Sequence, residues 1–482
     1  MNGFTEIELL LLLPFCFGAG LLLLPSRFNQ LFSVLSALLY AVICFNLSLP
    51  IALGGNPVEA QSFAWASSEW LPKFRLDGVS AAFILLTAVV SLVVFSVGGK
   101  WYKERPKLYS FLNFAIVGLL NGAFLSRDLL LFYVFFEAVF IPVIFVLGLW
   151  GSEQKGIATL RFVLMSLVGS LLMLVSILTL GWQSYRMTGT FTLDAFQLSS
   201  IADQMSPVLR SWVFVGFLAA FAIKLPIAPL HSWLPDAYTS APTPLTIWLS
   251  SVISKLGAIG IFRFVLPLFA PVVQAHHTLL LYWAAASIVY ASFMAMRESN
   301  PKTMLAYSSV SHLGFVAFGL FTGSAEGAAA AMFLAVAHGF ASAGLFAVEE
   351  ARQQRSIGTL VQSAPQLSAL AFVLVLAGVS LPGTANFVGE FLVLKDGFLA
   401  EVGPTVLATC GVVLGAVYML TYFQRYFFQV AKEESTSRSD VRGFEWIAVL
   451  PCVAIILFLG LQPNIVLNAL QGGQNGHDTS NH

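Results

Sequence analysis

The sequence predicts an all-α, polytopic membrane protein with about fourteen transmembrane helices. Of its 482 residues, 58% are hydrophobic and only 10% are charged, whereas about a quarter of the residues in soluble proteins are charged. Apolar runs of about 18 or more residues, long enough to cross the hydrocarbon core as helices, recur along the whole chain. Two proline-rich or glycine-rich stretches interrupt these runs. We therefore expect one membrane domain and no separate globular domain.

The expected spans follow from these runs in chain order. They are 6–24, 30–52, 77–98, 107–126, 128–150, 158–183, 208–230, 243–269, 277–297, 301–323, 326–350, 362–402 (broken), 403–430 and 444–468. The first span lacks a preceding basic region, so it is interpreted as a spanning helix and not as a signal or transit peptide. Most lysines and arginines lie in connections that would share one side, as the positive-inside rule requires. Both ends of the chain, including the polar tail 471–482, are expected on the other side.

Two of the spans cannot be continuous helices. The stretch 221–244 contains five prolines, and the stretch 381–390 reads LPGTANFVGE. Such breaks remove backbone donors and are tolerated in a bilayer only against protein or a water-filled cavity. The first break falls in the fourth member of spans 4–8, and the second in the fourth member of spans 9–13. Matched breaks are typical of internally repeated transporters with a site near the midplane.

This pattern divides the chain into four expected segments. Residues 1–106 hold helices 1–3, and residues 107–270 form the first five-helix repeat with helices 4–8. Residues 271–430 form the second repeat with helices 9–13, and residues 431–482 hold the last helix and the polar C-terminal tail.

Several kinds of chemistry are not expected in this chain. The 24 basic and 24 acidic residues balance to a net charge of zero, so nothing indicates a nucleic-acid partner. The four cysteines stand alone in apolar runs, without the pairing of zinc, haem or iron–sulfur sites. Neither a dinucleotide fingerprint nor a P-loop is found. Any redox cofactor or metal is therefore expected in another subunit.

Two ionisable residues in the first repeat lie inside apolar runs. Glu137 is near the middle of its span, where a carboxylate stays charged only when an opposite charge offsets its desolvation. Lys224 ends the apolar run before the first break and is the expected partner. A purely structural buried salt bridge is the alternative interpretation.

Lys255 lies in the middle of the next apolar run and has no acidic neighbour in sequence. A charged lysine near the bilayer centre costs at least a few kcal/mol, so it is rarely found there without a partner or a function. Such a residue can hold or release a proton in a relay. The alternative is that its side chain extends to a membrane interface.

The second repeat contributes His312, His338 and Glu390 to the same series. Histidine titrates near physiological pH and can pass protons, although a lone histidine in an apolar helix can also be a satisfied core residue. His231 adjoins the first break and is a weaker candidate. Glu390 follows the second break and ends the row. A row of ionisable residues inside membrane spans is typical of a proton wire.

Three stretches carry a resemblance to a known family. They are 132–151 (FYVFFEAVFIPVIFVLGLWG), 220–237 (AFAIKLPIAPLHSWLPDA) and 381–391 (LPGTANFVGEF). These closely resemble the M-type antiporter-like subunit of respiratory complex I, known in mitochondria as NADH–ubiquinone oxidoreductase chain 4, and the resemblance extends over essentially the whole chain. The related L-type subunit is longer, and the N-type differs around its fifth-helix glutamate.

The resemblance implies two inverted five-helix repeats, each with a broken helix, and proton translocation driven by quinone reduction elsewhere in the complex. It implies proton-transfer roles for Glu137, Lys224, Lys255, His312, His338 and Glu390. NADH, FMN, iron–sulfur clusters and ubiquinone would bind other subunits. Neighbouring L-type and N-type subunits and lipids such as cardiolipin would be partners. The implied location is the mitochondrial inner membrane, with the bacterial plasma membrane as the alternative.

The sequence departs from the family pattern near Lys255, where Trp248 and three serines, Ser250, Ser251 and Ser254, replace the small apolar residues of many members. Two other functions stay open at this point. One is an Mrp-type sodium/proton antiporter subunit, which would share the fold and the row of charges. The other is a membrane subunit with a purely structural role.

Overall fold

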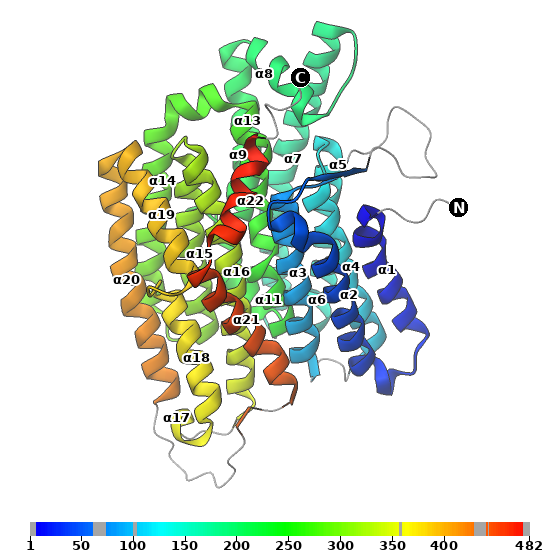
Figure 1. Cartoon of the computed structure of the whole chain (residues 1–482), viewed down its shortest axis with the longest axis vertical. Helices are drawn as coiled ribbons and strands as arrows, with labels where there is room; N and C mark the ends of the chain where they lie inside the picture. Colours follow the sequence, from blue (N-terminus) through cyan, green and yellow to red (C-terminus); the bar gives the residue numbers. More distant parts are fainter. Residues whose placement is uncertain are drawn as a thin grey trace.

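The computed structural model describes residues 6–60, 74–99, 104–355, 359–428, 440–441 and 443–475. Long helices run side by side through most of the molecule (Figure 1). In this part of the chain, thirteen helices are long and apolar enough to cross a membrane, and the shorter apolar helix Pro365–Gly378 belongs to the broken twelfth span. The prediction of an all-α polytopic membrane protein is confirmed. The predicted tail beyond residue 475 lies outside the described residues.

The N-terminal segment consists of three membrane helices and a small hairpin. Its elements are α1 (Glu6–Leu23), η1 (Ser26–Phe28), α2 (Asn29–Ala52), β1 (Val58–Ala60), β2 (Phe74–Leu76) and α3 (Gly78–Val97). The antiparallel strands pair Val58 with Leu76. Three-residue strands are too short to show a two-residue hydrophobic period, which is why the sequence did not predict them. Helix α3 is almost wholly buried and packs against α2, α11, α16 and α21.

The first predicted repeat contains more interruptions than expected. Its elements are α4 (Pro106–Leu125), α5 (Leu129–Ala138), α6 (Phe140–Trp150), α7 (Lys155–Thr188), α8 (Ala195–Gln204), α9 (Pro207–Lys224), α10 (Trp233–Ser240), α11 (Thr243–Ser251), η3 (Ile253–Lys255), α12 (Leu256–Gly260), η4 (Ile261–Val265) and α13 (Leu266–Leu268). The fifth span is interrupted at Val139, and the eighth span includes the 3₁₀ turn η3 and the π-helical turn η4. Such turns inside helices often mark functional positions. Lys255 lies in one of them.

The first break follows Lys224 directly. Helix α9 ends there, and the chain resumes as helix α10 at Trp233. The indole nitrogen of Trp233 donates a hydrogen bond to the backbone oxygen of Ile223 over 2.8 Å. This contact satisfies a carbonyl near the end of α9, as burial in a membrane requires. The predicted break is confirmed, although its second half is helical.

The second predicted repeat surrounds one central helix. It contains α14 (Ala270–Arg297), α15 (Pro301–Phe321), α16 (Ala325–Gln353), α17 (Leu360–Ser363), α18 (Pro365–Gly378), α19 (Ala385–Ala400) and α20 (Val402–Phe427). The second break lies between α18 and α19, as expected, and includes Gly383 with a φ of +97°. The apolar part of α16 is wholly buried, and α16 packs against α3, α11, α15 and α19.

The last elements that the structure describes are α21 (Gly443–Leu461) and α22 (Asn464–Asn475). The single last span predicted over 444–468 is therefore wrong at its C-terminal end. Pro463 lies between the two helices, and its carbonyl accepts hydrogen bonds from the first residues of α22. Proline cannot supply the backbone donor that a continuous helix needs. The four-segment division and the inverted relationship between the two repeats stay predictions.

Candidate functional site

A buried lysine and a buried histidine form the first contact of the candidate site. The Nζ atom of Lys255 lies 2.9 Å from Nδ1 of His338 and also donates to the backbone oxygen of Ser250. The Lys255 side chain has no exposed surface. It therefore does not extend to an interface, and the sequence alternative for this residue is excluded.

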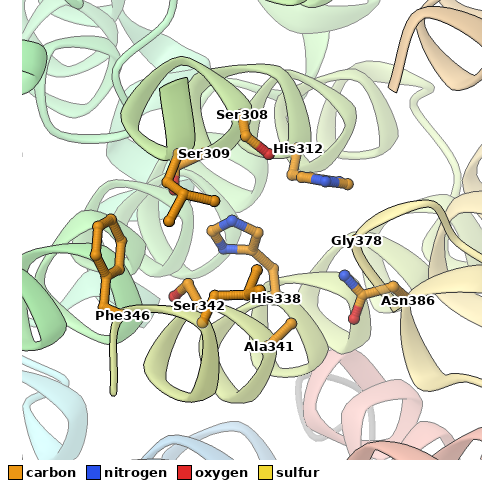
Figure 2. Close-up of a pocket in the computed structure, with 11 residues that line it drawn as sticks. Ser308, Ser309, His312, His338, Ala341, Ser342, Phe346, Gly378 and Asn386 are labelled. Atoms are coloured by element: carbon orange, nitrogen blue, oxygen red, sulfur yellow. The ribbon is translucent and has the colours of Figure 1, made fainter. Parts of the chain in front are cut away.

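The row continues from α16 to α15 and α19. The rings of His338 and His312 have centroids 5.3 Å apart, and Nδ1 of His312 lies 2.7 Å from a carboxylate oxygen of Glu390. All three side chains are buried. Figure 2 shows the His338 ring in the space between α16 and α15, with the His312 side chain above it and to the right. The structure thus brings together four of the six predicted site residues, from four separate elements.

Two glycines allow these helices to approach closely. A Cβ atom on Gly339, next to His338, would lie 2.8 Å from the backbone oxygen of Ser251 on α11. A Cβ atom on Gly389, next to Glu390, would lie 2.9 Å from the Cα atom of Leu334 on α16. Contacts this short with backbone atoms would force the helices apart. The absence of a side chain at both positions therefore helps the row to form.

Lys224 has surroundings that the sequence did not predict. Its Nζ atom donates a hydrogen bond to the hydroxyl of Ser166 on α7 over 2.6 Å and lies 3.2 Å from the centroid of the Phe140 ring. The rings of Phe162 and Phe136 lie at 5.3 and 5.7 Å. Aromatic faces attract cations, and more strongly where water is excluded. The ammonium group is thus stabilised by aromatic rings and a hydroxyl.

Glu137 and Lys224 do not form a direct salt bridge, so their expected partnership would act over a longer distance. Among the described residues, no carboxylate oxygen lies within the 4.0 Å of Lys224 Nζ that defines a salt bridge. Glu137 still interacts with this lysine electrostatically, and its Oε1 atom is buried without a hydrogen-bond partner. The interruption of the fifth span at Val139 separates the helical turn of Glu137 from Phe140, which occupies the space next to the ammonium group.

The residues that depart from the family pattern have clear contacts. The indole nitrogen of Trp248 donates to the side-chain oxygen of Asn113 on α4 over 3.0 Å. The hydroxyl of Ser251 lies 3.2 Å from that of Ser342 on α16. The side chain of Trp248 is thus fixed by α4, and the serine pair connects α11, which precedes the turn with Lys255, to α16, which carries His338.

Sequence reasoning missed two buried glutamates at the end of α16. Glu349 accepts two hydrogen bonds from Arg352, over 2.7 and 2.8 Å, and one from the Tyr422 hydroxyl on α20 over 3.2 Å. Glu350 accepts from the hydroxyl of Thr243, the first residue of α11. Adjacent acidic residues in the last turn of an apolar helix were the available signal. They connect α16 to the helices on either side of it.

Another missed residue is Asn386, in the first turn of α19. It lines a small cavity of about 10 Å³ together with both histidines of the row (Figure 2). The available signal was the amide side chain in the second break, four residues before Glu390.

Arg263 and Asp77 form an ion pair that the sequence did not predict. Arg263 lies in η4, near the end of the eighth span, and its NH2 atom lies 3.0 Å from both carboxylate oxygens of Asp77. Burial alone would raise the pKa of Asp77, but the charge of Arg263, hydrogen bonds from Ser80 and the charge of Arg75 together lower this pKa below its ordinary value of 3.8. The pair connects η4 to the residue that precedes α3.

His231, the weaker candidate of the sequence, makes its contacts outside the row of ionisable residues. The ring of His231 contacts the rings of Tyr290 and Tyr307, with centroids 5.2 and 6.0 Å away. Within the described ranges, no group of three or more histidine, cysteine or acidic side chains could hold a metal ion. Cys16, Cys44, Cys410 and Cys452 are free thiols.

Comparisons with known proteins show the family of this chain. The sequence matches the family model described as NADH:quinone oxidoreductase/Mrp antiporter, TM, over residues 126–415. NADH-quinone oxidoreductase subunit 13 of Thermus thermophilus is 38% identical over 482 residues, which cover 96% of this chain and 97% of the relative. NADH-ubiquinone oxidoreductase chain 4 of Arabidopsis thaliana is 31% identical over 476 residues, which cover 96% of this chain and 94% of the relative.

Comparison with solved structures also identifies complex I. A chain of respiratory complex I from Thermus thermophilus with bound NADH superposes with a TM-score of 0.85 at 35% identity, covering 98% of this chain and 99% of that one. A chain of the Mrp complex from Dietzia sp. reaches a TM-score of 0.84 at 19% identity, with 98% of both chains covered, which shows a shared fold alone. This multi-pass membrane protein therefore belongs to the NADH:quinone oxidoreductase/Mrp antiporter family and, within it, to the M-type (chain 4) subunits of NADH:quinone oxidoreductase, a translocase complex.

Proposed function

We propose that this chain translocates protons in the membrane arm of complex I, coupled to quinone reduction in other subunits. The pathway consists of Glu137, Lys224, Lys255, His338, His312 and Glu390. The observation that carries this proposal is the contact series from Lys255 through the two histidines to Glu390, whose members are all buried. Ionisable groups in such a series can exchange protons while protein shields them from lipid.

The charge at Lys224 supplies the coupling. Movement of Glu137 towards an adjacent subunit would weaken the electrostatic stabilisation of the Lys224 ammonium group. Because no direct salt bridge holds the two groups together, this movement breaks no ion-pair contact. The proton of Lys224 then passes to Lys255, and the histidines carry it to Glu390 for release or onward coupling.

The exposed face near Glu137 supports a protein partner. On α5 and α6, Val134, Ile141 and Phe145 are each at least half exposed. We propose that this face contacts a neighbouring antiporter-like subunit, of the L-type or the N-type, and that lipids such as cardiolipin cover the remaining apolar surface. NADH, FMN, iron–sulfur clusters and ubiquinone bind other subunits in this proposal.

The proposed location is an energy-transducing membrane. The sequence favours the mitochondrial inner membrane, with the bacterial plasma membrane as the alternative. The identity of 38% with the Thermus subunit, against 31% with the plant chain, supports the bacterial alternative. Fractionation of the source cells, with immunodetection of this chain, distinguishes the two.

The decisive experiment measures proton pumping by reconstituted complex that carries Lys255→Ala. We expect a lower proton-to-electron ratio with the complex still assembled, because the central carrier is removed. A ratio equal to that of the unmodified complex would contradict the proposal. Lys155→Ala is the matched control, since this lysine lies at the start of α7, and its Nζ atom contacts the backbone oxygen of Leu149. An assembled but uncoupled Lys255 variant also excludes a purely structural role.

An Mrp-type sodium/proton antiporter subunit is the alternative function, and the shared fold supports it. Purification of the tagged chain from its native membrane separates the two functions. Co-purifying redox subunits with NADH:quinone reductase activity support complex I. Co-purifying antiporter subunits without redox subunits support the alternative.

A further inference from the structure

The contact between the two histidines is the one transfer step between Lys255 and Glu390 that lacks a direct hydrogen bond. Nδ1 of His338 faces Lys255, and Nδ1 of His312 faces Glu390. A proton that enters one ring at Nδ1 must leave from Nε2. Within the described residues, neither Nε2 atom has a hydrogen-bond partner in the protein. Transfer between the rings therefore needs a bridging group.

The cavity beside the two rings has room for such a group. Its volume of about 10 Å³ is close to the space that one water molecule needs. Both imidazoles line it, with hydroxyl and amide side chains from three helices: Ser308, Ser309, Ser342 and Asn386. A buried water needs two to four polar partners, and this lining supplies enough of them. The cavity is too small for a hydrated cation or an organic ligand.

Asn386 is the strongest indication of a bound molecule. Its side chain has no exposed surface, yet neither its Oδ1 nor its Nδ2 atom has a hydrogen-bond partner in the protein. Both atoms are affected, so the conclusion does not depend on which way the amide is oriented. Leaving a buried polar group unpaired costs about 1–3 kcal/mol. Figure 2 shows the amide end of this side chain pointing towards His338.

We propose that Asn386 holds one water molecule in this cavity, and that this water passes protons from Nε2 of His338 to Nε2 of His312. The binding of the water rests on the cavity and on the unpaired amide of Asn386, whereas the proton transfer through it rests on the proposed function. Asn386 acts here as a positioning residue, because it fixes the water and does not itself exchange the proton.

The proposed transfer conserves the number of protons. Lys255 gives a proton to Nδ1 of His338, whose Nε2 proton moves to the water oxygen. The water gives another of its protons to Nε2 of His312, and the Nδ1 proton of His312 moves to Glu390. The water is unchanged, Lys255 becomes neutral and Glu390 becomes protonated. Each imidazole ring changes from one neutral tautomer to the other. Both rings must return to their starting tautomers before the next proton can be transferred.

The first test is a high-resolution cryo-EM map of the intact complex. We expect density for one water within hydrogen-bond distance of the Asn386 amide and both Nε2 atoms. The same map of Asn386→Leu, which has a similar shape but no polar atoms, should lack this density. An empty cavity in the unmodified complex overturns the proposal, and so does unchanged density in the leucine variant.

The second test measures proton pumping in the same variants. Asn386→Leu should lower the proton-to-electron ratio as far as Lys255→Ala does, with electron transfer and assembly retained. Asn386→Ser, which restores a hydroxyl, should recover part of the loss, an effect that repacking alone would not produce. An unchanged ratio in Asn386→Leu overturns the relay if Lys255→Ala lowers the ratio. If Lys255→Ala also leaves the ratio unchanged, the proposed function itself fails.

Discussion

The ammonium group of Lys224 lies 3.2 Å from the centroid of the Phe140 ring, and it donates to a serine hydroxyl instead of forming a salt bridge with Glu137. A cation held this way does not need an adjacent carboxylate to stay in place. Its charge still responds to Glu137, because electrostatic interactions extend well beyond contact distance in a low dielectric. The geometry thus suits a reversible coupling better than a permanent ion pair would.

Removal of the Phe140 ring should weaken the stabilisation of the Lys224 ammonium group. Phe140→Leu keeps the position apolar but removes a cation–π interaction worth about 2 kcal/mol in a desolvated site. We expect a lower proton-to-electron ratio in reconstituted complex, with normal assembly. Phe293→Leu, which makes the same change at an exposed position of α14, is the control. Equal ratios in the two variants would show that the ring does not contribute to coupling.

Glu390→Gln should uncouple the end of the row. Glutamine keeps the size of the side chain and can still bind His312, but it cannot take up a proton. Electron transfer should continue while pumping falls, as measured by quinone reduction and acidification in the same vesicles. Glu401→Gln changes a carboxylate that follows the same helix and contacts Thr278 instead, so it should pump normally. Normal pumping by the Glu390 variant would remove this residue from the pathway.

Gly389→Ala should destabilise the contact between α19 and α16. The added methyl carbon would lie 2.7 Å from Cβ of Leu334, and overpacking of this kind costs about 1–3 kcal/mol. A lower thermal unfolding midpoint of the purified complex is the expected result. Gly148→Ala places the same methyl group where no atom lies within 4 Å, so its midpoint should stay close to that of the unmodified complex. Similar midpoints for both variants would argue against the close approach of the two helices.

The ion pair between Asp77 and Arg263 predicts a pH dependence of stability. Asp77 precedes the membrane-spanning part of α3, and its pKa in the folded protein is below 3.8. A lowered pKa means that the stabilisation is fully present above pH 3.8 and is lost as the pH falls through the folded value. Asp77→Asn should therefore be less stable at neutral pH, by about 3 kcal/mol.

This difference should shrink as the pH falls below 3.8. Unfolding midpoints of the complex at neutral and acidic pH, with and without the substitution, check this expectation. A difference that stayed constant down to the lowest pH at which the complex survives would contradict it.

The sequence by itself determined the class of fold and the identity of the charged residues. Hydropathy identified the spans because burial in a bilayer depends on composition over about 18 to 20 consecutive residues. The prolines and glycines of 221–244 and 381–390 located both breaks, since their effect on the backbone is local. Lys255, His338 and Glu390 stood out because ionisable residues are costly in apolar spans. All of these signals depend on residues that are close together in the sequence.

Only the tertiary structure decided which side chains meet. His338 is 83 residues from Lys255, and their contact depends on how α16 and η3 are rotated about their axes. The ring beside Lys224, the partner of Arg263 and the cavity at Asn386 depend on the same relative placement of helices. The spacing of residues along one helix determines how deep each residue lies in the membrane and on which face of the helix it stands. It does not determine which residue of another helix lies opposite. That choice follows from packing, including the close approaches at Gly339 and Gly389.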